Sequence, residues 1–183
     1  FAFENCTSLE TVYMPGSLNE VGPDAFENCN ALKSVYIPSI ETWCKMTFDS
    51  NPLLYGADLY CNGEKMVDLV IPENITSIKK DAFIGCGSLK TVVIPDNVSS
   101  LGAWCFSRCN SLEEISISEA ISEIPIGFSW DCENLRKVSI PESVISIKTQ
   151  AFSHTGLLEV NLPESVMTIE KNAFSECDNL KII

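Results

Sequence analysis

The stretch AFIGCGSLKTVVIP, residues Ala82–Pro95, decides the fold because close copies of it recur along the chain. AFENCTSLETVYMP begins at Ala2, and AFENCNALKSVYIP begins at Ala25. In each copy a unit L-x-x-V-x-I-P follows an A-F-x-x-C segment. The first apolar residue of this unit falls at Leu9, Leu32, Met66, Leu89, Leu112, Leu135, Leu157 and Leu180. Successive spacings are 23, 34, 23, 23, 23, 22 and 23 residues, so the chain is a repeat protein.

Each repeat predicts one short strand. KTVVIP and RKVSIP alternate apolar and polar residues, which is typical of a strand with one buried face. Proline has no N–H to donate and therefore ends the strand. The A-F-x-x-C segment is expected to turn the chain back, as one helical turn. One unit cannot bury its apolar face, whereas stacked units can, with strands about 4.8 Å apart in a parallel sheet.

These features predict a single domain over residues 1–183 with the α/β repeat solenoid fold. We expect a right-handed leucine-rich-repeat solenoid, with a parallel sheet of short strands and irregular or short helical returns. Because the chain begins and ends inside a repeat, we interpret it as a fragment, with any signal peptide or anchor outside it.

The 34-residue step between Leu32 and Met66 marks a degenerate coil, Ile40–Pro72. Within it, Asn62-Gly63 separates two strand-like segments. An Asn-Gly pair between strands is a strong hairpin signal, since both central residues of the turn need a positive φ. We therefore predict an inserted β-hairpin, whose first arm pairs beside or beyond the regular strand, with Trp43 and Phe48 in the core.

The repeat pattern, together with the insertion W-x-x-x-x-F…NPL…G-x-x-L-Y-x-NGE, resembles the BspA-like leucine-rich repeats of bacterial surface proteins. The resemblance covers essentially the whole chain. It implies a secreted or cell-surface module that adheres to host or extracellular-matrix proteins, with no catalytic residues. The alternative is an accessory or spacer repeat module of a larger secreted enzyme.

Composition argues against several functions. The formal net charge is −13 with only 12 Lys and Arg, a balance that repels nucleic acid and anionic lipid. No apolar run is long enough to span a membrane. A Ser-His-Asp triad is disfavoured because the one histidine, His154, falls in a turn between repeats. We therefore predict no enzyme activity, no cofactor, no nucleic-acid partner and no membrane insertion in this fragment.

The recurring cysteine allows three interpretations. Six of nine occupy the same slot of successive repeats: Cys6, Cys29, Cys86, Cys109, Cys132 and Cys177. A row along an axis does not supply the tetrahedral ligands that zinc needs, so we predict no metal site. Disulfides are one alternative: a bond between neighbouring coils has a suitable Cα separation but parallel Cβ vectors, and Cys44 and Cys61, outside the slot, could pair across the hairpin. The other, which we favour, is that all nine are reduced, buried and apolar.

The outward positions of the strands form the candidate contact surface. The N-terminal half of this face is apolar and aromatic, whereas the C-terminal half is small and polar. Exposed tyrosine is enriched in binding surfaces, although tyrosine and valine also favour strands for their own sake. The predicted protein-contact residues are Thr11, Tyr13, Ser34, Tyr36, Asp68, Val70, Thr91 and Val93.

Overall fold

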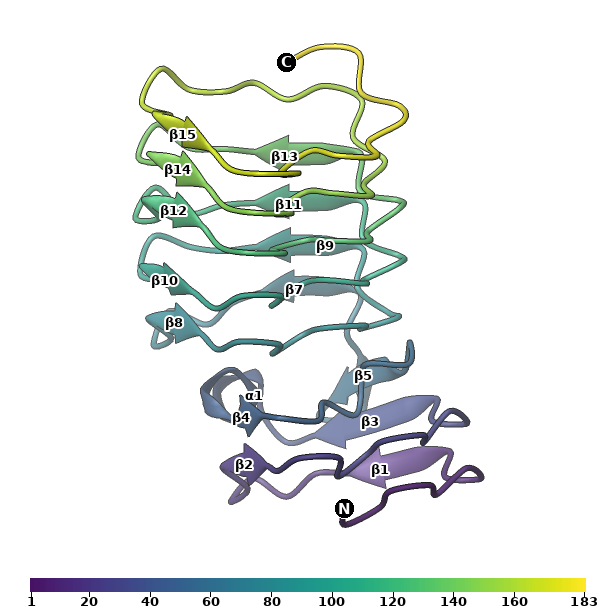
Figure 1. Cartoon of the computed structure of the whole chain (residues 1–183). Coiled ribbons are helices and arrows are strands. Elements are labelled where there is room, and N and C mark those ends of the chain that lie inside the picture. Colours follow the sequence, from purple (N-terminus) through teal and green to yellow (C-terminus); the bar gives the residue numbers. More distant parts are fainter.

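The computed structural model describes residues 1–183 and shows a solenoid of about seven coils with its termini at opposite ends (Figure 1). One wall carries the strands predicted from the repeat unit. Its strands are β1 (Thr11–Tyr13), β3 (Ser34–Ile37), β5 (Asp58–Cys61), β7 (Asp68–Val70), β9 (Thr91–Val93), β11 (Glu114–Ser116) and β13 (Lys137–Ser139). These strands are parallel and pair in register, with Thr91 opposite Glu114 and Val93 opposite Ser116. The predicted parallel-sheet solenoid is confirmed.

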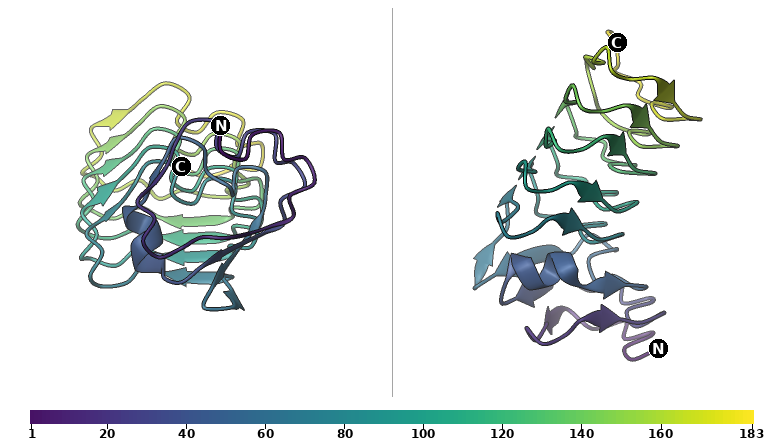
Figure 2. Two further views of the ribbon diagram at one scale, coloured as in Figure 1. Left: turned by 90° about the horizontal axis from the view of Figure 1, so that it is seen from below. Right: turned by 90° about the vertical axis from the view of Figure 1, so that its left-hand side faces the viewer.

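A second wall contains two-residue strands that the sequence analysis did not predict. They are β2 (Glu20–Val21), β4 (Thr47–Phe48), β8 (Ser77–Ile78), β10 (Ser100–Leu101), β12 (Glu123–Ile124), β14 (Ser146–Ile147) and β15 (Thr168–Ile169). Between the two walls the chain turns at the proline. The carbonyl of Pro72 accepts from Ile75 N, and that of Pro95 accepts from Val98 N. Seen along the axis, the coils lie over one another (Figure 2).

The A-F-x-x-C returns are irregular turns and not the helical turn that we expected. In every return after the first, two residues have a positive φ, as Asp24 and Asn28 do in one coil and Trp104 and Arg108 in another. A residue in the left-handed region cannot continue a right-handed helix. The returns are instead held by backbone bonds between coils, such as Phe83 N to the carbonyl of Cys105 at 2.8 Å.

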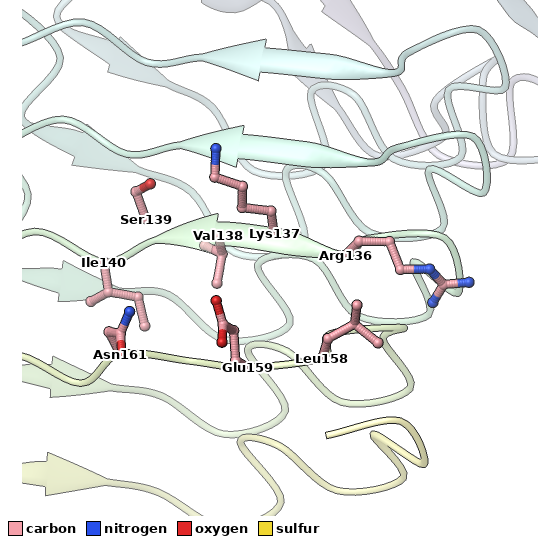
Figure 3. A pocket seen from close by; sticks show the side chains of 8 residues that line it. All are labelled: Arg136, Lys137, Val138, Ser139, Ile140, Leu158, Glu159 and Asn161. Carbon is pink, nitrogen blue, oxygen red and sulfur yellow. The ribbon is translucent and has the colours of Figure 1, made fainter. Parts of the chain in front are cut away.

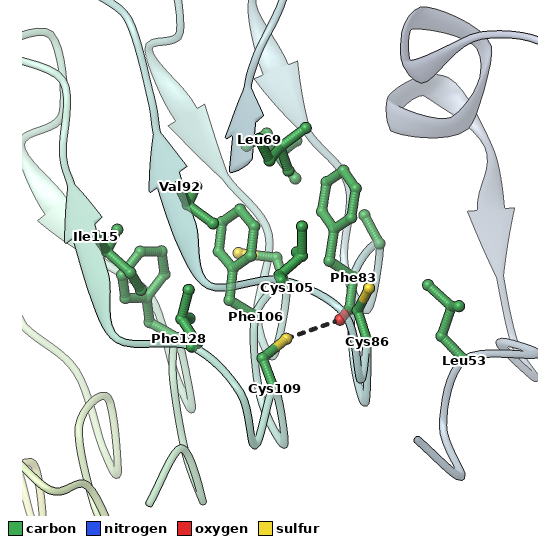
Figure 4. Packing of buried hydrophobic residues seen from close by; sticks show 14 of the residues in the cluster. Leu53, Leu69, Phe83, Cys86, Val92, Cys105, Phe106, Cys109, Ile115 and Phe128 are labelled. Carbon is green, nitrogen blue, oxygen red and sulfur yellow. Dashed lines mark hydrogen bonds between the residues drawn. The ribbon is translucent and has the colours of Figure 1, made fainter. Parts of the chain in front are cut away.

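The core runs along the axis as one cluster of buried apolar side chains (Figure 4). Phe83 and Phe106 stack in adjacent coils with ring centroids 5.3 Å apart. The next coil lacks a clean A-F pair, and Phe128 occupies its alanine position. The hydrogen bonds show this equivalence: the carbonyl of Phe128 accepts from Phe106 N, just as the carbonyl of Cys105, at the alanine position of its own coil, accepts from Phe83 N. Phe128 therefore meets Phe106 edge to face, at 83°, and the core stays filled.

The degenerate coil contains the one helix, α1 (Ile40–Lys45), and the predicted hairpin. Strand β5 pairs with β3 in parallel, and β6 (Glu64–Lys65) pairs with β5 in antiparallel around Asn62 and Gly63, which both have a positive φ. Trp43 and Phe48 are buried, as predicted. The hairpin ends the first sheet at β6, and a second sheet begins at β7.

Side chains join the two stacks where the hairpin interrupts the sheet. The indole N–H of Trp43 donates to the carbonyl of Ala82 at 2.7 Å, and the amide of Asn51 donates to the carbonyls of Asp81 and Ala82 at 2.8 and 3.1 Å. The N–H of Leu59 donates to the hydroxyl of Ser88 at 3.2 Å. The side-chain donors of Trp43 and Asn51 and the side-chain acceptor of Ser88 take the place of backbone groups that other coils present.

We predict that Asn51→Ala lowers the free energy of unfolding by about 1–3 kcal/mol, because it removes the acceptor of the buried Leu53 N–H, which donates to the side-chain oxygen of Asn51 at 2.8 Å. Asn51 is 4% exposed. Urea titration followed by circular dichroism measures the effect. Asn134→Ala is the matched control, since the exposed amide of Asn134 bridges to the carbonyl of Asn110 in the preceding coil. Equal losses in the two variants would contradict the assigned role of Asn51.

Candidate functional site

All eight predicted contact residues lie on the outer face of the first wall. In each strand they flank an inward residue: Val12 is half-buried, and Val35, Leu69 and Val92 are buried. Tyr13 is 73% exposed, Val70 62% and Val93 41%. The alternation expected from the repeat unit therefore places these side chains outward. Their role in binding remains a prediction.

The predicted row is interrupted between Tyr36 and Val70. The strand beside β3 is β5, so the neighbour of Tyr36 is Tyr60 and not Val70. The structure therefore divides the surface in two. The tyrosine face comprises Thr11, Tyr13, Ser34, Tyr36, Asp58 and Tyr60, and the valine face comprises Asp68, Val70, Thr91 and Val93.

Sequence reasoning missed Tyr60 because the 34-residue step hides its place in the repeat. The signal was present in Asp58-Leu59-Tyr60, which repeats the outward, inward, outward pattern of Ser34-Val35-Tyr36. Leu59 is fully buried, as the inward residue of that pattern should be.

The three tyrosines form a stack along the solenoid axis. The ring centroids of Tyr13 and Tyr36 are 4.7 Å apart with an interplanar angle of 16°, and those of Tyr36 and Tyr60 are 4.6 Å apart with an angle of 19°. In-register pairing brings the rings to the strand spacing, so they lie nearly parallel. Each ring restricts its neighbour, which gives an aromatic surface that loses little side-chain entropy on binding.

Charged side chains around both faces are largely paired with one another. Lys65 lies 2.6 Å from Asp58, whose carboxylate raises the pKa of the Lys65 ammonium group. On the valine face the Thr91 hydroxyl donates to Asp68 at 2.7 Å. Most charges beside the two faces are therefore neutralised by a partner. Each face offers a binding partner mainly aromatic and apolar contact area.

The recurring cysteine does more than fill space. In four coils its thiol donates to the carbonyl of a phenylalanine in the preceding coil, as Cys109 does to Phe83 at 3.1 Å (Figure 4). The other three donors are Cys29, Cys132 and Cys177, at 3.2, 3.1 and 3.1 Å. The thiol thus acts as a small apolar group and as a hydrogen-bond donor between coils, a role that the sequence analysis missed.

The expectation that all nine cysteines are buried is wrong for three of them. Cys6 is exposed because no coil lies below it in the structure, and Cys61 and Cys177 are partly exposed. All nine are free thiols, including Cys44 and Cys61, for which a disulfide was the alternative. Burial raises the pKa of the Cys44 thiol to about 12 and that of Cys105 and Cys109 well above the ordinary value.

Neither a metal centre nor a membrane-spanning helix is found. No three or more His, Cys, Asp and Glu side chains gather in a way that could hold a metal ion. No helix has the length and apolar character that crossing a bilayer requires.

The fold and the surface define a class of protein, the leucine-rich-repeat solenoids that present extended faces. The BspA type leucine rich repeat region, in six copies, matches residues 1–55 and 54–181. The chain therefore belongs to the BspA-type leucine-rich repeat family. No curated protein matches the sequence.

Solved structures share the fold at low sequence identity. A leucine-rich cell surface protein of Faecalibacterium prausnitzii is 23% identical with a TM-score of 0.68, over 100% of this chain and 61% of that one. A leucine-rich repeat protein of T. pallidum is 24% identical with a TM-score of 0.62, over 93% of this chain and 78% of that one. The pneumococcal vaccine antigen PcpA is 19% identical with a TM-score of 0.57, over 96% of this chain and 50% of that one.

We predict that Cys6 alone reacts rapidly with a thiol reagent in the native protein at pH 8. The buried thiols are inaccessible, and burial also raises the pKa of Cys86 and Cys105, which keeps these two protonated. Ellman's reagent should give one fast equivalent, slower labelling of Cys61 and Cys177, and nine equivalents in denaturant. Cys6→Ser should remove the fast phase. Several fast equivalents in that variant would contradict the buried row.

We also predict that stability falls as the pH rises above about 9. The folded-state pKa of Cys44 is raised from 9.0 to about 12, so between these values the unfolded chain releases a proton that the folded chain keeps. The contribution is fully present below pH 9 and is lost as the pH rises toward 12. Urea midpoints in reducing buffer at pH 8, 9 and 10 measure the slope. Cys44→Ala, although less stable, should show a shallower slope, and an unchanged slope would refute the assignment.

Proposed function

We propose that the chain is a non-catalytic protein-binding module of a secreted or cell-surface protein, and that the tyrosine face makes the contact. The observation that carries the proposal is the outward stack of Tyr13, Tyr36 and Tyr60. Tyrosine is enriched among residues that dominate binding energies, because it combines a large apolar ring with a hydroxyl group. Solenoids commonly bind through extended faces of this kind.

The geometry of the stack restricts how a partner binds. Because the ring faces are turned toward one another, a partner would meet mainly ring edges and hydroxyl groups, and Tyr13 is the most exposed of the three rings, at 73%. A flat protein surface with hydrogen-bond partners for a row of hydroxyl groups suits this arrangement. The partner that we propose is a protein of a host surface or of the extracellular matrix.

Two further observations support the proposal. The family of this chain consists of repeat proteins, and the Faecalibacterium protein that shares the fold is described as a cell surface protein. The one histidine of the chain, His154, lies outside the strands of the outer wall, which disfavours a Ser-His-Asp triad on that wall. His154 lies on a return, where it faces Glu176 at 3.4 Å.

The test compares binding to a panel of immobilised extracellular-matrix and host-surface proteins. Replacing Tyr13, Tyr36 and Tyr60 together by alanine should weaken binding to whichever partner the wild type binds by at least about tenfold, since hot-spot residues each contribute about 2 kcal/mol or more. Biolayer interferometry measures the affinities, and circular dichroism confirms that the variant is folded.

The control variant carries Val70→Ala and Val93→Ala on the valine face, and should bind its partner as the wild type does. A folded tyrosine variant that retains full affinity would overturn the proposal. A loss confined to the valine variant would move the contact to the second sheet.

A further inference from the structure

The first wall opens between β13 and the segment Leu158–Asn161 of the next coil (Figure 3). The second sheet ends at β13. The backbone of the segment Leu158–Asn161 forms hydrogen bonds only with the coil after it. Val160 N donates to the carbonyl of Ile182, and Lys181 N donates to the carbonyl of Leu158, both at 3.0 Å. No backbone hydrogen bond joins it to residues 136–140. Strand β13 thus has a free edge near the C-terminal end of the solenoid, with the segment Leu158–Asn161 beyond it.

The cause is a change in coil length. The step from Leu135 to Leu157 is 22 residues, one fewer than in the regular coils. The sequence Gly87-Ser88-Leu89 of a regular coil corresponds to Gly156-Leu157 in the short one. The other sides of this coil stay closed, since β14 pairs with β15 and Phe152 N donates to the carbonyl of Ala173 at 2.8 Å. The opening is therefore held in place and is not a frayed end.

The free edge presents a defined set of backbone groups. In the regular coil the carbonyl of Lys90 accepts from Glu113 N, and Ile94 N donates to the carbonyl of Ser116. The corresponding groups of the coil with β13 are the carbonyl of Arg136 and the N–H of Ile140. The N–H and carbonyl of Val138 lie between them, because parallel strands use alternate residues on each side. These groups match the pattern that an added strand requires.

The cavity at this edge has a volume of about 700 Å³, and Val138, Ile140 and Leu158 give it an apolar lining. Its charges are not all paired. Lys137 pairs with Glu114 at 2.5 Å, whereas the Arg136 guanidinium group donates only to the carbonyls of Gly156 and Glu133. Neither Arg136 nor Glu159 forms a salt bridge.

We propose that this opening is a strand-addition site, in which an extended segment of a partner protein pairs with the free edge of β13. The segment would carry an acidic side chain near Arg136 and a basic one near Glu159. Main-chain bonds then supply affinity, and the two charges supply register. The site shares no residue with the tyrosine face, so either one can fail without the other.

The probe is the acetylated and amidated peptide LEKVSI. It is the sequence Leu135–Ile140 with glutamate in place of arginine, and therefore has the strand pattern that pairs with β13 in this solenoid. Amide exchange of the full chain, followed by NMR, reports the bound edge. Saturating peptide should slow exchange at Val138 and Ile140 at least tenfold. The same peptide N-methylated at its lysine and serine, the residues that face β13 in this register, should leave exchange unchanged.

Two variants of the chain test the site itself. Inserting serine after Gly156 restores the regular coil length, should close the sheet and should abolish peptide binding. Glu159→Lys replaces an exposed side chain that makes no bond, and should weaken binding several-fold even if the insertion disturbs folding. The Tyr13, Tyr36 and Tyr60 alanine variant should bind the peptide as the wild type does.

Each remaining outcome overturns the proposal. Failure of the wild type to bind LEKVSI, equal binding of the N-methylated peptide, or protection at β1 in place of β13 would each do so. Full binding by a folded insertion variant or by Glu159→Lys would also show that the opening is not the site. In that case its charged rim only keeps a free strand edge from aggregating.

Discussion

The backbone hydrogen bond from one coil to the next is the interaction on which the rest of this structure depends. It repeats in both strand walls and in the returns, for example from Phe83 N to Cys105 and from Ile94 N to Ser116. Because successive coils are held in register at the strand spacing, equivalent residues of neighbouring repeats lie directly over one another. Any side chain that recurs at one place in the sequence therefore becomes a row in space.

These rows give the molecule both its core and its surface. Phe83 over Phe106 and Cys109 over Phe83 stabilise the interior, whereas Tyr13, Tyr36 and Tyr60 extend the same rule to the outer face. The two interruptions have one origin, a change in coil length. At the hairpin, Trp43 and Asn51 supply the missing donors, but at the short coil only the Arg136 guanidinium group bridges part of the opening.

Periodicity explains how much could be predicted from sequence. The strands, the parallel stacking, the hairpin at Asn62-Gly63 and the outward direction of Tyr13 and Val93 all follow from local patterns, and all are found. Features that depend on the neighbouring coil could not be read from one repeat. The thiol of Cys109 finds its acceptor 26 residues away in sequence, and Cys6 is exposed although it occupies the same position of the repeat.

The candidate site shows the same limit of prediction from a single repeat, because the neighbour of Tyr36 was predicted wrongly. Counting by the repeat unit leads from Tyr36 to Val70, but a hairpin adds a strand without adding a full coil, so Tyr60 intervenes. Similarly, Phe128-Ser129 stands where other coils have the A-F pair. The ring nevertheless reaches the core from the adjacent position, because its neighbours Phe106 and Phe152 accept an edge-to-face contact at 83° and 79°.

The binding function that we propose suits a solenoid built on this interaction for a geometric reason. Catalysis brings different groups from separate parts of the chain to one point, whereas in-register stacking distributes similar groups along a line. The tyrosine stack is such a line, and its repeat equals the strand spacing. Departures from the line occur only where a coil gains or loses residues. A partner that must distinguish one part of this wall from another therefore has two landmarks, the hairpin beside Tyr60 and the open edge of β13.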